Sequence, residues 1–548
     1  MDFNKAVEVC LKKHARNTDT FVRYGTAGFR DRAETLDYIM YRMGLLATLR
    51  SCVKQAAIGV MVTASHNPEE DNGVKLIDPL GEMLEESWEV HATDLVNSGD
   101  ADLVTVLKNI VGNNKCPDNF QPVVLIARDT RQSSASLARS VFDGVEAIGG
   151  KCKDYGVLTT PQLHFLVHWY NSHDNQFADT SQYYNRITNA FKDLRGQELC
   201  RDNYTNQLVV DCANGVGAVA METFIEKLQD SLAVELVNEG KGGKINYMCG
   251  ADYVKVQQKA PQVHQGKNLM VPGVRCASLD GDADRIVYFY TDLDGEFHLL
   301  DGDRIATLIA GYLCDQLSAS ELDIKLGLVQ TAYANGSSTK YITQEMKIPI
   351  SCAKTGVKHL HKLALNYDIG VYFEANGHGT VLFSEKAQKT IEDASVNPGL
   401  NDTQKKSTLC LKMMLDLINQ TVGDAISDLL VVETILHARG WSIVDWEKLY
   451  NDLPNKQLKV KVKDRTVIST TDAERKCITP ANLQNVIDIL VSKFTNGRSF
   501  ARPSGTENVV RVYAEADTQA NADKLAYEVA GSIYDLAGGV GERPSLPQ

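Results

Sequence analysis

Three stretches of the chain repeat one local pattern, in which an apolar run ends in a polar or glycine-rich loop and a second element follows. The first stretch contains the segments 58–73 and 121–131, the second contains 208–220, 234–240 and 275–290, and the third contains 326–342, 348–363 and 369–383. Short strands separated by loops and helices are typical of α/β domains with a mostly parallel sheet. Ligands of open α/β sheets bind at the carboxyl ends of the strands, so the chemistry is expected in the loops at these ends.

The rest of the chain frames these segments. We expect helices over 37–56, from about Ser134, and over 405–445, a sheet return at 155–163, and a polar linker or surface excursion at 171–206. The last hundred residues differ, because a strand at 458–462, a helix at 482–494, strands on either side of Arg502 and a helix at 520–536 indicate an α+β domain. We therefore predict the α/β class, with three similar mixed β-sheet/helix domains around a cleft and a C-terminal α+β domain. The expected boundaries are 1–190, 191–298, 299–445 and 446–548.

Composition limits the kind of partner. The 548 residues are 43% hydrophobic and 23% charged, as in a soluble globular protein, and the formal net charge of -13 argues against a nucleic-acid or anionic-membrane partner. Twelve scattered cysteines without a CxxC motif favour reduced thiols in a cytoplasmic setting. No apolar run approaches the length of a membrane span, and the N-terminus has no apolar signal core. No obligate protein partner is evident.

Ser65 stands where an alternating apolar strand ends, in the segment Gly59–Gly73. Pro68 stops the strand, because it cannot donate to a ladder and keeps Asn67 out of the helical region. A serine at an exposed strand end can act as a nucleophile or phosphate carrier. The alternative is structural, since Asn67-Pro68-Glu69-Glu70 also resembles the capped start of a helix.

The loop Asp280-Gly281-Asp282-Ala283-Asp284-Arg285 is the strongest local signal. Three carboxylates at alternate positions repel one another unless a cation lies among them, and their hard oxygens suit magnesium or calcium rather than zinc. An EF-hand is excluded, because Arg285 and Thr291 stand where that loop needs Gly and Glu. A phosphate on Ser65 would complete the ligand set. The alternative is a solvated acidic turn.

Three further loops offer ligands for an anionic sugar. Arg502, Pro503, Ser504, Gly505 and Thr506, with Arg511 following, provide guanidiniums, hydroxyls and a glycine amide that suit a phosphate, although a hairpin loop is the alternative. Glu374, Ala375, Asn376 and His378 place acceptors and donors where sugar hydroxyls could bind, or form an ordinary polar loop. Arg30, after Gly-Thr-Ala-Gly, could reach an anion, although an ordinary glycine turn is the alternative. Lys354 is a candidate for phosphate contact or proton transfer, although it could be a surface lysine.

Together, the four loops TASHNP, DGDADR, FEANGH and RPSGTE resemble those of the α-D-phosphohexomutase family, in the same order and over essentially the whole chain. The resemblance implies a phosphoserine domain, a metal-binding domain, a sugar-binding domain and a phosphate-binding domain. It implies that Ser65 carries phosphate, that Ser65, Asp280, Asp282 and Asp284 bind Mg²⁺, and that Lys75 is the general acid/base, although its spacing alone suggests a surface lysine. Arg30 and Arg285 join the catalytic candidates.

The sequence departs from the glucose and mannose members at one position. Those members carry Ser two residues after the sugar-loop Glu, whereas this chain has Asn376. The sequence is most similar to eukaryotic members that act on phosphorylated N-acetylglucosamine. The resemblance therefore implies interconversion of N-acetylglucosamine 6-phosphate and 1-phosphate, with a sugar 1,6-bisphosphate as intermediate and activator, on the route to UDP-N-acetylglucosamine. Two rivals are a metal-dependent phosphatase, which needs no second phosphate site, and a phosphosugar sensor without turnover.

Overall fold

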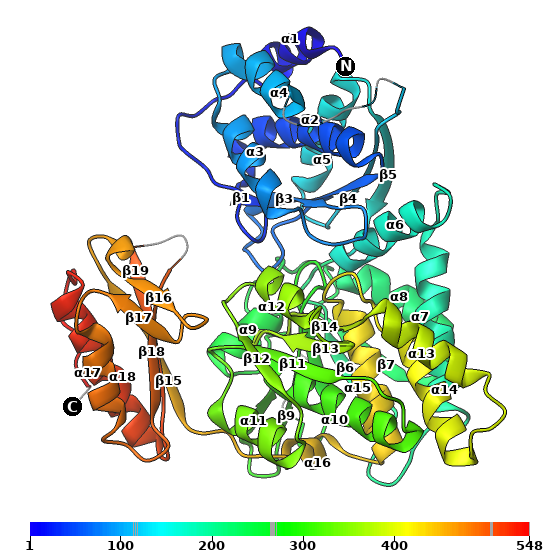
Figure 1. Ribbon diagram of the computed structural model, residues 1–548, viewed down its shortest axis with the longest axis vertical. Helices are drawn as coiled ribbons and strands as arrows, with labels where there is room; N and C mark the ends of the chain where they lie inside the picture. Colours follow the sequence, from blue (N-terminus) through cyan, green and yellow to red (C-terminus); the bar gives the residue numbers. More distant parts are fainter. Residues whose placement is uncertain are drawn as a thin grey trace. The chain divides into compact units, whose positions relative to one another are not determined.

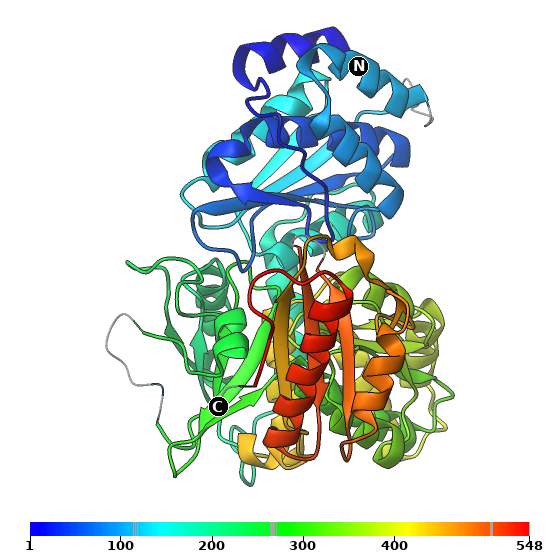
Figure 2. The same cartoon turned by 90° about the vertical axis from the view of Figure 1, so that its left-hand side faces the viewer.

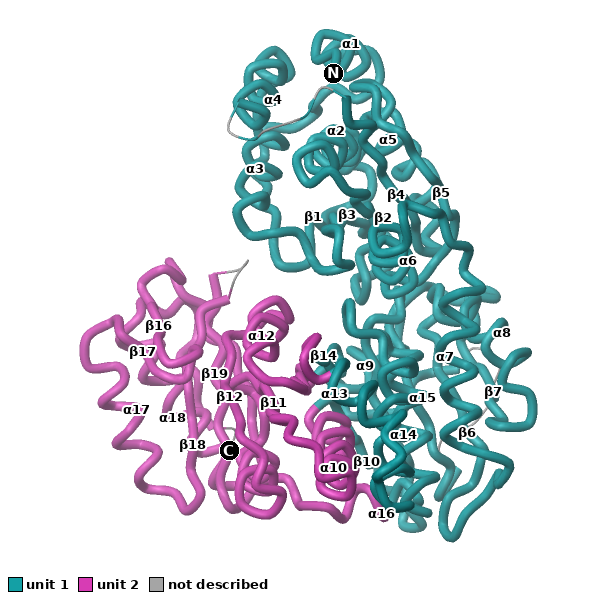
Figure 3. The backbone as a smooth tube through the Cα atoms, turned by 45° about the vertical axis from the view of Figure 1, so that its right-hand side comes forward, with its two compact units in different colours: residues 1–302, 376–383, 388–444 teal, residues 303–375, 384–387, 445–548 magenta. Residues whose placement is uncertain are grey.

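The structure is a computed structural model that describes residues 1–112, 114, 117, 119–263, 269, 271–504 and 508–546. The chain divides into two compact units, which we describe separately (Figure 3). Unit 1 comprises residues 1–302, 376–383 and 388–444, and unit 2 comprises residues 303–375, 384–387 and 445–548. The candidate residues therefore fall into two groups, each with its own geometry.

The first sheet of unit 1 has the order β1-β3-β2-β4-β5 (Figure 1). Its strands are β1 (Phe29–Arg32), β2 (Ile58–Val62), β3 (Asp71–Ile77), β4 (Val123–Arg128) and β5 (Lys151–Val157). The strands β2, β4 and β5 are parallel, whereas β3 runs antiparallel to β1 and β2. The sheet is therefore mixed, as predicted.

Helices cover both faces of this sheet. α2 (Asp37–Lys54) and α5 (Ser134–Ala147) pack against each other on one face, and α6 (Thr160–Ser172) packs against β2 and β4 from the other (Figure 1). The two helices on the first face approach closely, because a Cβ atom at Gly44 would lie 2.1 Å from the carbonyl oxygen of Val141. α6 begins in a capping box between Thr159 and Gln162.

The second sheet of unit 1 repeats the plan with the order β10-β9-β8-β6-β7. Its strands are β6 (Gln207–Asp211), β7 (Ala233–Val237), β8 (Cys276–Leu279), β9 (Ile286–Thr291) and β10 (Phe297–Leu300). Val287 and Phe289 pack with α9 (Ala251–Gln257) on one face, while Tyr288 on the other donates to the carbonyl of Leu429 in α15 (Ala425–Arg439) at 3.3 Å. The acidic loop therefore joins two central strands, β8 and β9.

The prediction of a polar linker or surface excursion at 171–206 is wrong. This segment contains α7 (Thr180–Arg195), which packs against α8 (Gly217–Leu228), α14 (Asp402–Leu417) and α15. Tyr183, Ile187 and Phe191 are buried, and their spacing of four residues places them on one helical face. The many polar residues between them conceal this stripe in the sequence.

Unit 2 contains a parallel set of strands and the C-terminal antiparallel sheet. β11 (Leu326–Thr331) pairs in parallel with β12 (Ile350–Ala353) and with β13 (Ile369–Phe373). The C-terminal sheet has the order β15-β19-β18, and α17 and α18 cover one of its faces (Figure 1, Figure 2). These elements are β15 (Asn455–Lys461), α17 (Leu483–Val491), β18 (Arg498–Pro503), β19 (Val509–Glu515) and α18 (Gln519–Leu536). The predicted α+β character of the tail is confirmed.

The other named elements complete the chain. They are α1 (Phe3–Lys13), α3 (Glu86–Asn97), α4 (Leu103–Gly112), α10 (Gly302–Ser320), α11 (Gly336–Lys340), α12 (Val357–Ala364), α13 (Glu385–Ser395), α16 (Ile443–Glu447), β14 (Gly379–Phe383), β16 (Ser469–Thr471) and β17 (Lys476–Thr479). In the described residues, no helix is both long and apolar enough to cross a membrane. The fold class is confirmed, whereas the four domain boundaries and the cleft stay predictions.

Candidate active site

Ser65 lies in the turn after β2, with its backbone in the left-handed region at a φ of 51°. Its N–H donates to Thr63 Oγ1 at 2.9 Å. Its carbonyl accepts from Arg131 at 3.0 Å and from Asn246 at 2.7 Å. The hydroxyl donates to Asp280 Oδ2 at 2.8 Å, across 215 residues of sequence. The expected exposure of Ser65 is wrong, since the side chain is fully buried against the acidic loop of the same unit.

The helix-cap interpretation of the residues after Ser65 is also wrong. The chain makes a turn after Pro68 and enters β3 at Asp71, so no helix begins there. Asn67 Nδ2 donates to the carboxylate of Asp71 at 3.1 Å, which closes the loop through a side chain. The loop thus presents Ser65 to the acidic loop and serves no helix.

A buried ion pair supports the serine loop from the next strand. Asp129 and Arg131 follow β4 and form an ion pair with both side chains fully buried. Arg131 Nη2 also donates to the carbonyl of Asn67 at 2.8 Å, and Thr63 Oγ1 donates to Asp129 at 2.8 Å. The Arg128–Arg131 segment, which the sequence marks only as a strand exit, therefore fixes the backbone on both sides of Ser65.

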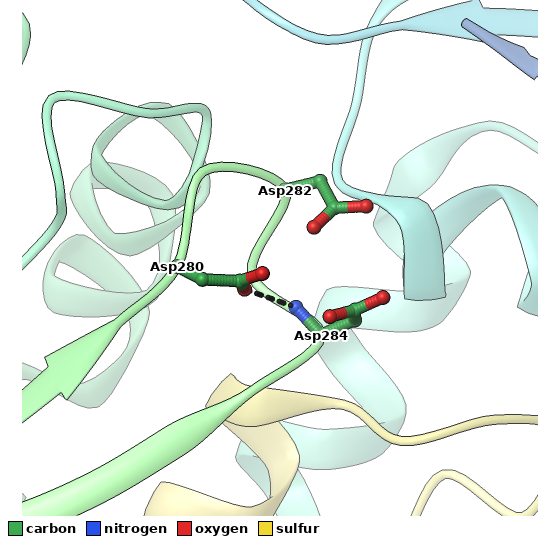
Figure 4. Close-up of side chains that lie close together, drawn as sticks. All are labelled: Asp280, Asp282 and Asp284. Atoms are coloured by element: carbon green, nitrogen blue, oxygen red, sulfur yellow. Dashed lines mark hydrogen bonds between the residues drawn. The ribbon is translucent and has the colours of Figure 1, made fainter. Parts of the chain in front are cut away.

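The three aspartates of the acidic loop are buried and converge, as Figure 4 shows. One oxygen from each of Asp280, Asp282 and Asp284 lies within 4.8 Å of the others. The N–H of Asp284 donates to Asp280 Oδ1 at 3.0 Å, and this bond curls the loop around its carboxylates. A solvated acidic turn is excluded, because the charges do not face solvent.

Lys75 lies against this cluster and is not a surface residue. It stands on β3, and its ammonium contacts Asp282 at 3.1 Å and Asp284 at 3.2 Å. Thr160, at the start of α6, donates to the same Asp282 oxygen at 2.6 Å. The interpretation of Lys75 as a surface lysine from its spacing is therefore wrong, because contacts across more than 200 residues decide its environment.

The pKa values of the clustered aspartates shift in opposite directions. Burial and the charges of Asp284 and Asp282 raise the pKa of Asp280 well above its usual value. Burial also disfavours ionised Asp284, but Lys75 and His378 outweigh it and hold the pKa of Asp284 well below its usual value. Asp282 Oδ1 is buried without a hydrogen-bond partner among the described residues. A hard divalent cation fits this donor set, since it would neutralise the carboxylates and occupy the unsatisfied oxygen.

The two arginines among the catalytic candidates, Arg30 and Arg285, contact different residues around the serine loop. Arg30, on β1, donates to Asn67 Oδ1 at 3.3 Å in the serine loop. Arg285 donates to Asp252 at 2.6 Å, and His66 lies 3.4 Å from the same carboxylate. Both guanidiniums thus border the serine and the acidic loop within unit 1, where they could meet an anion.

The sugar-loop candidates belong to both units. In unit 1, His378 is buried with Nδ1 3.3 Å from Asp284 Oδ1, and its N–H donates to Asn376 Oδ1 at 3.1 Å. In unit 2, Glu374 Oε1 accepts the N–H of Gly356 at 3.0 Å, beside the exposed Lys354. The roles of these residues and of Ala375 in binding substrate stay predictions.

The phosphate-loop candidates follow the pairing of the C-terminal sheet. Arg502 and Arg511 are direct cross-strand partners, and Lys459 on β15 pairs with Arg511 from the other side. Pro503 ends β18, Ser504 is buried, and Gly505 and Thr506 lie outside the described residues. Like charges placed directly opposite destabilise a sheet. A row of three cations therefore favours an anion at this place.

Several neighbours of the candidates were missed in the sequence. Thr160, Asn246 and Lys459 contact or pair with candidate residues, and Asp129 and Arg131 support the serine loop. Thr160 and Arg131 stand in segments recognised only as strand exits, and Lys459 follows the alternation of a strand. For Asn246 the sequence offers no signal, because it acts from an irregular segment.

The chain matches family descriptions over most of its length. These are "Phosphoglucomutase/phosphomannomutase, alpha/beta/alpha domain I" over 44–103 and 94–176, "Phosphoacetylglucosamine mutase AMG1, domain II" over 174–287, "Phosphoacetylglucosamine mutase AMG1, domain III" over 301–441, and "Phosphoglucomutase/phosphomannomutase, C-terminal domain" over 458–532. It is 53% identical to phosphoacetylglucosamine mutase of Homo sapiens over 532 residues, 97% of each chain. The chain belongs to the phosphoacetylglucosamine mutase family.

Solved structures from this family agree with the fold. One is the Aspergillus fumigatus N-acetylphosphoglucosamine mutase in complex with GlcNAc-6P and magnesium, with a TM-score of 0.91 and 44% identity, covering 98% of this chain and 99% of that one. Another structure of the A. fumigatus protein, with glucose 1,6-bisphosphate, has a TM-score of 0.90, 44% identity and the same coverage. A third structure, of an N-acetylglucosamine-phosphate mutase described as a member of the α-D-phosphohexomutase superfamily, has a TM-score of 0.90 and 45% identity, covering 96% of this chain and 99% of that one. The chain is thus an isomerase of this superfamily.

Proposed function

We propose that this member of the phosphoacetylglucosamine mutase family interconverts N-acetylglucosamine 6-phosphate and N-acetylglucosamine 1-phosphate through a phosphorylated Ser65. The observation that carries the proposal is the 2.8 Å hydrogen bond from the Ser65 hydroxyl to Asp280, inside a buried cluster of three carboxylates. A hydroxyl in that position is held where a phosphoryl group and a cation would meet. The product would supply the synthesis of UDP-N-acetylglucosamine.

The proposed reaction is a pair of phosphoryl transfers. The bond between phosphorus and Ser65 Oγ breaks as a bond from phosphorus to the free sugar hydroxyl forms, and this gives a 1,6-bisphosphate. Lys75 gives a proton to the leaving oxygen and takes up the proton of the attacking hydroxyl, so its charge is restored. The second transfer returns the other phosphoryl group to Ser65. Added sugar bisphosphate would activate enzyme that has lost its phosphate.

The acidic cluster is the proposed metal site. Asp280, Asp282 and Asp284 would hold Mg²⁺ together with the phosphate on Ser65, and the ion would neutralise charge on the phosphoryl oxygens. The chain's own residues orient the serine: Arg131 and Asn246 fix its carbonyl, and Thr63 accepts its N–H. This arrangement keeps the hydroxyl in place before any ligand arrives.

The proposed distal phosphate site is the arginine pair of unit 2. Arg502 and Arg511 are direct partners on the neighbouring strands β18 and β19. Ser504, Gly505 and Thr506 follow Arg502 in the sequence. A mutase must hold the phosphate that does not react, whereas a phosphatase needs no such site. The arginine pair therefore supports phosphoryl transfer to a sugar over hydrolysis. We expect the ligands to be sugar phosphates and the protein to act in the cytoplasm.

The proposed function is tested by measuring phosphate on Ser65, sugar isomerisation and release of free phosphate. We expect wild-type enzyme treated with glucose 1,6-bisphosphate to carry phosphate on Ser65, and Ser65→Ala to lose both this label and turnover of N-acetylglucosamine 6-phosphate. Free phosphate released as fast as sugar is isomerised would indicate a phosphatase. A Ser65→Ala protein that folds and still turns over above about 1% of the wild-type rate, roughly 2.7 kcal/mol of barrier, would refute the phosphoserine mechanism.

Asn376 is proposed to favour the acetamido sugar. Its amide can both donate and accept a hydrogen bond near a substituent at C2. The glucose and mannose members have a serine hydroxyl at this position instead of an amide. We expect Asn376→Ser to move the ratio of kcat/KM toward glucose 6-phosphate over N-acetylglucosamine 6-phosphate. An unchanged ratio would contradict this role.

A further inference from the structure

Glu474 stands at the tip of the β16–β17 hairpin in unit 2 and uses both carboxylate oxygens. Its Oε1 accepts from Arg502 Nε at 2.9 Å, and its Oε2 accepts from the backbone N–H of Thr355 at 2.9 Å. The ion pair is largely shielded, with side-chain exposures of 17% for Arg502 and 14% for Glu474. The sequence shows nothing of this contact, because hairpin, loop and sheet are distant along the chain.

The hairpin holds Glu474 in an unfavourable backbone conformation. Three consecutive residues, Asp472, Ala473 and Glu474, have φ of 52°, 53° and 69°, in the left-handed region that residues with a Cβ atom avoid. Arg475 closes the turn by donating to the carboxylate of Asp472 at 2.5 Å. Such conformations persist where the surroundings require them, and here they direct Glu474 at an arginine.

A continuous series of hydrogen bonds joins the two binding loops of unit 2 through this carboxylate. Glu474 holds the N–H of Thr355, and the next N–H, of Gly356, donates to Glu374 at 3.0 Å. Glu374 is the candidate sugar ligand, and Arg502 is the candidate phosphate ligand. Two successive amides therefore connect the two carboxylates and, through Glu474, the arginine.

The contact leaves Arg502 able to bind an anion. Glu474 engages Nε, so the terminal nitrogens of the guanidinium are not the atoms it uses. Arg511 pairs with Arg502, and Lys459 pairs with Arg511 on its other side, so the row contains three cations and Glu474 contacts one of them. The carboxylate can thus fix the direction of the guanidinium while the row stays positively charged.

We propose that Glu474 is a positioning residue of the distal phosphate site, which holds Arg502 by its Nε and ties it to the loop that contacts Glu374. This inference rests on the proposed function, in which Arg502 binds the phosphate that does not react. A fixed guanidinium loses less side-chain freedom when phosphate arrives, so binding is tighter than with a mobile arginine. Glu474 itself does not contact the phosphate.

Binding and turnover of Glu474→Gln test the inference in the full-length enzyme. The glutamine has a similar size but no charge, and only one of its two terminal atoms can accept, so it cannot hold both Arg502 Nε and the N–H of Thr355, and its contact with Arg502 is weaker. We expect Kd for N-acetylglucosamine 6-phosphate, by calorimetry, and KM to rise about tenfold, with kcat changed less than about threefold. Glu474→Asp keeps the charge on a shorter side chain and should fall between wild type and Glu474→Gln.

The matched control is Asp472→Asn, which removes the charge of an exposed ion pair without touching Arg502, while the N–H and Nε of Arg475 still donate to the carbonyl of residue 472 and keep the turn closed. We expect its Kd to equal that of the wild type. Glu474→Gln is then repeated in an Arg502→Ala background, where it should cause no further loss, because it acts through the arginine. A merely structural role for the hairpin would give the same loss in both backgrounds.

Two results overturn the inference in distinguishable ways. If Arg502→Ala weakens binding but Glu474→Gln binds as well as wild type, or more tightly, the positioning role is wrong and the phosphate site stands. If Arg502→Ala itself leaves Kd unchanged, the distal phosphate assignment fails, and the role of Glu474 fails with it.

Discussion

Replacing Arg131 with alanine should loosen the loop that carries Ser65. The Arg131 side chain is fully buried, and its guanidinium pairs with the fully buried Asp129. It also donates to the carbonyls of Ser65 and Asn67 at 3.0 and 2.8 Å. The substitution leaves the buried Asp129 carboxylate without its cation, and the carbonyls of Ser65 and Asn67 each lose one donor and keep, among the described residues, only Asn246.

The size of the effect follows from the buried charge. Removing one partner of a buried ion pair costs about 3–5 kcal/mol, and the two lost charge-assisted hydrogen bonds belong to the same disruption, so we do not add them. The serine loop should open more readily by this amount. Because Ser65 is then no longer held against Asp280, turnover should fall by more than about a hundredfold, or roughly 2.7 kcal/mol of barrier.

The assay is hydrogen exchange of peptides that cover β2, the serine loop and β3, together with turnover of N-acetylglucosamine 6-phosphate. Arg128→Ala is the matched control, since Arg128 ends the same strand but pairs with an exposed Asp154 at 3.5 Å. Exposed pairs contribute about 0–1 kcal/mol, so the control should exchange like wild type. If the serine-loop amides exchange at the same rate in Arg131→Ala as in Arg128→Ala, the buried ion pair does not support Ser65 and the reasoning is wrong.

Three further outcomes are expected. Asp282→Asn should weaken Mg²⁺ binding, measured by calorimetry, and lower the rate with it; full activity of chelator-treated wild type would refute a metal role. Glu433→Gln should destabilise unit 1 by about 3–5 kcal/mol in denaturant unfolding, because Arg275, paired with it at 2.8 Å, stays buried and charged; an unchanged midpoint would contradict this. Burial lowers the pKa of His14, but Asp37 at 2.9 Å and Asp143 at 3.3 Å together outweigh it and raise the pKa above 6.5. These ion pairs therefore stabilise the fold below about pH 6.5 and stabilise it less as pH rises through the raised value. The stability lost in His14→Gln should thus be larger at about pH 6 than at about pH 9. Equal losses at the two pH values would show that charged His14 does not stabilise the fold.

The sequence by itself located several of the local elements and the acidic triad. The apolar alternation over Ile58–Val62 located the strand before Ser65, and the helix expected from Ser134 begins at that residue. The spacing of Asp280, Asp282 and Asp284 in one short loop already indicated a hard cation, because adjacent carboxylates repel without one. These conclusions hold because strand and turn preferences, and repulsion within six residues, act over short stretches of chain.

Only the tertiary structure decided which of these residues meet. Lys75 has the spacing of a surface residue, but lies against Asp282 because β3 and the acidic loop, 207 residues apart, come together in unit 1. The same holds for Ser65, buried by Asp280, and for Glu474, whose contact with Arg502 depends on a hairpin tip. Periodicity reports which face of an element is apolar, whereas the partner of a buried charge is fixed by packing between distant segments, and no local pattern encodes it.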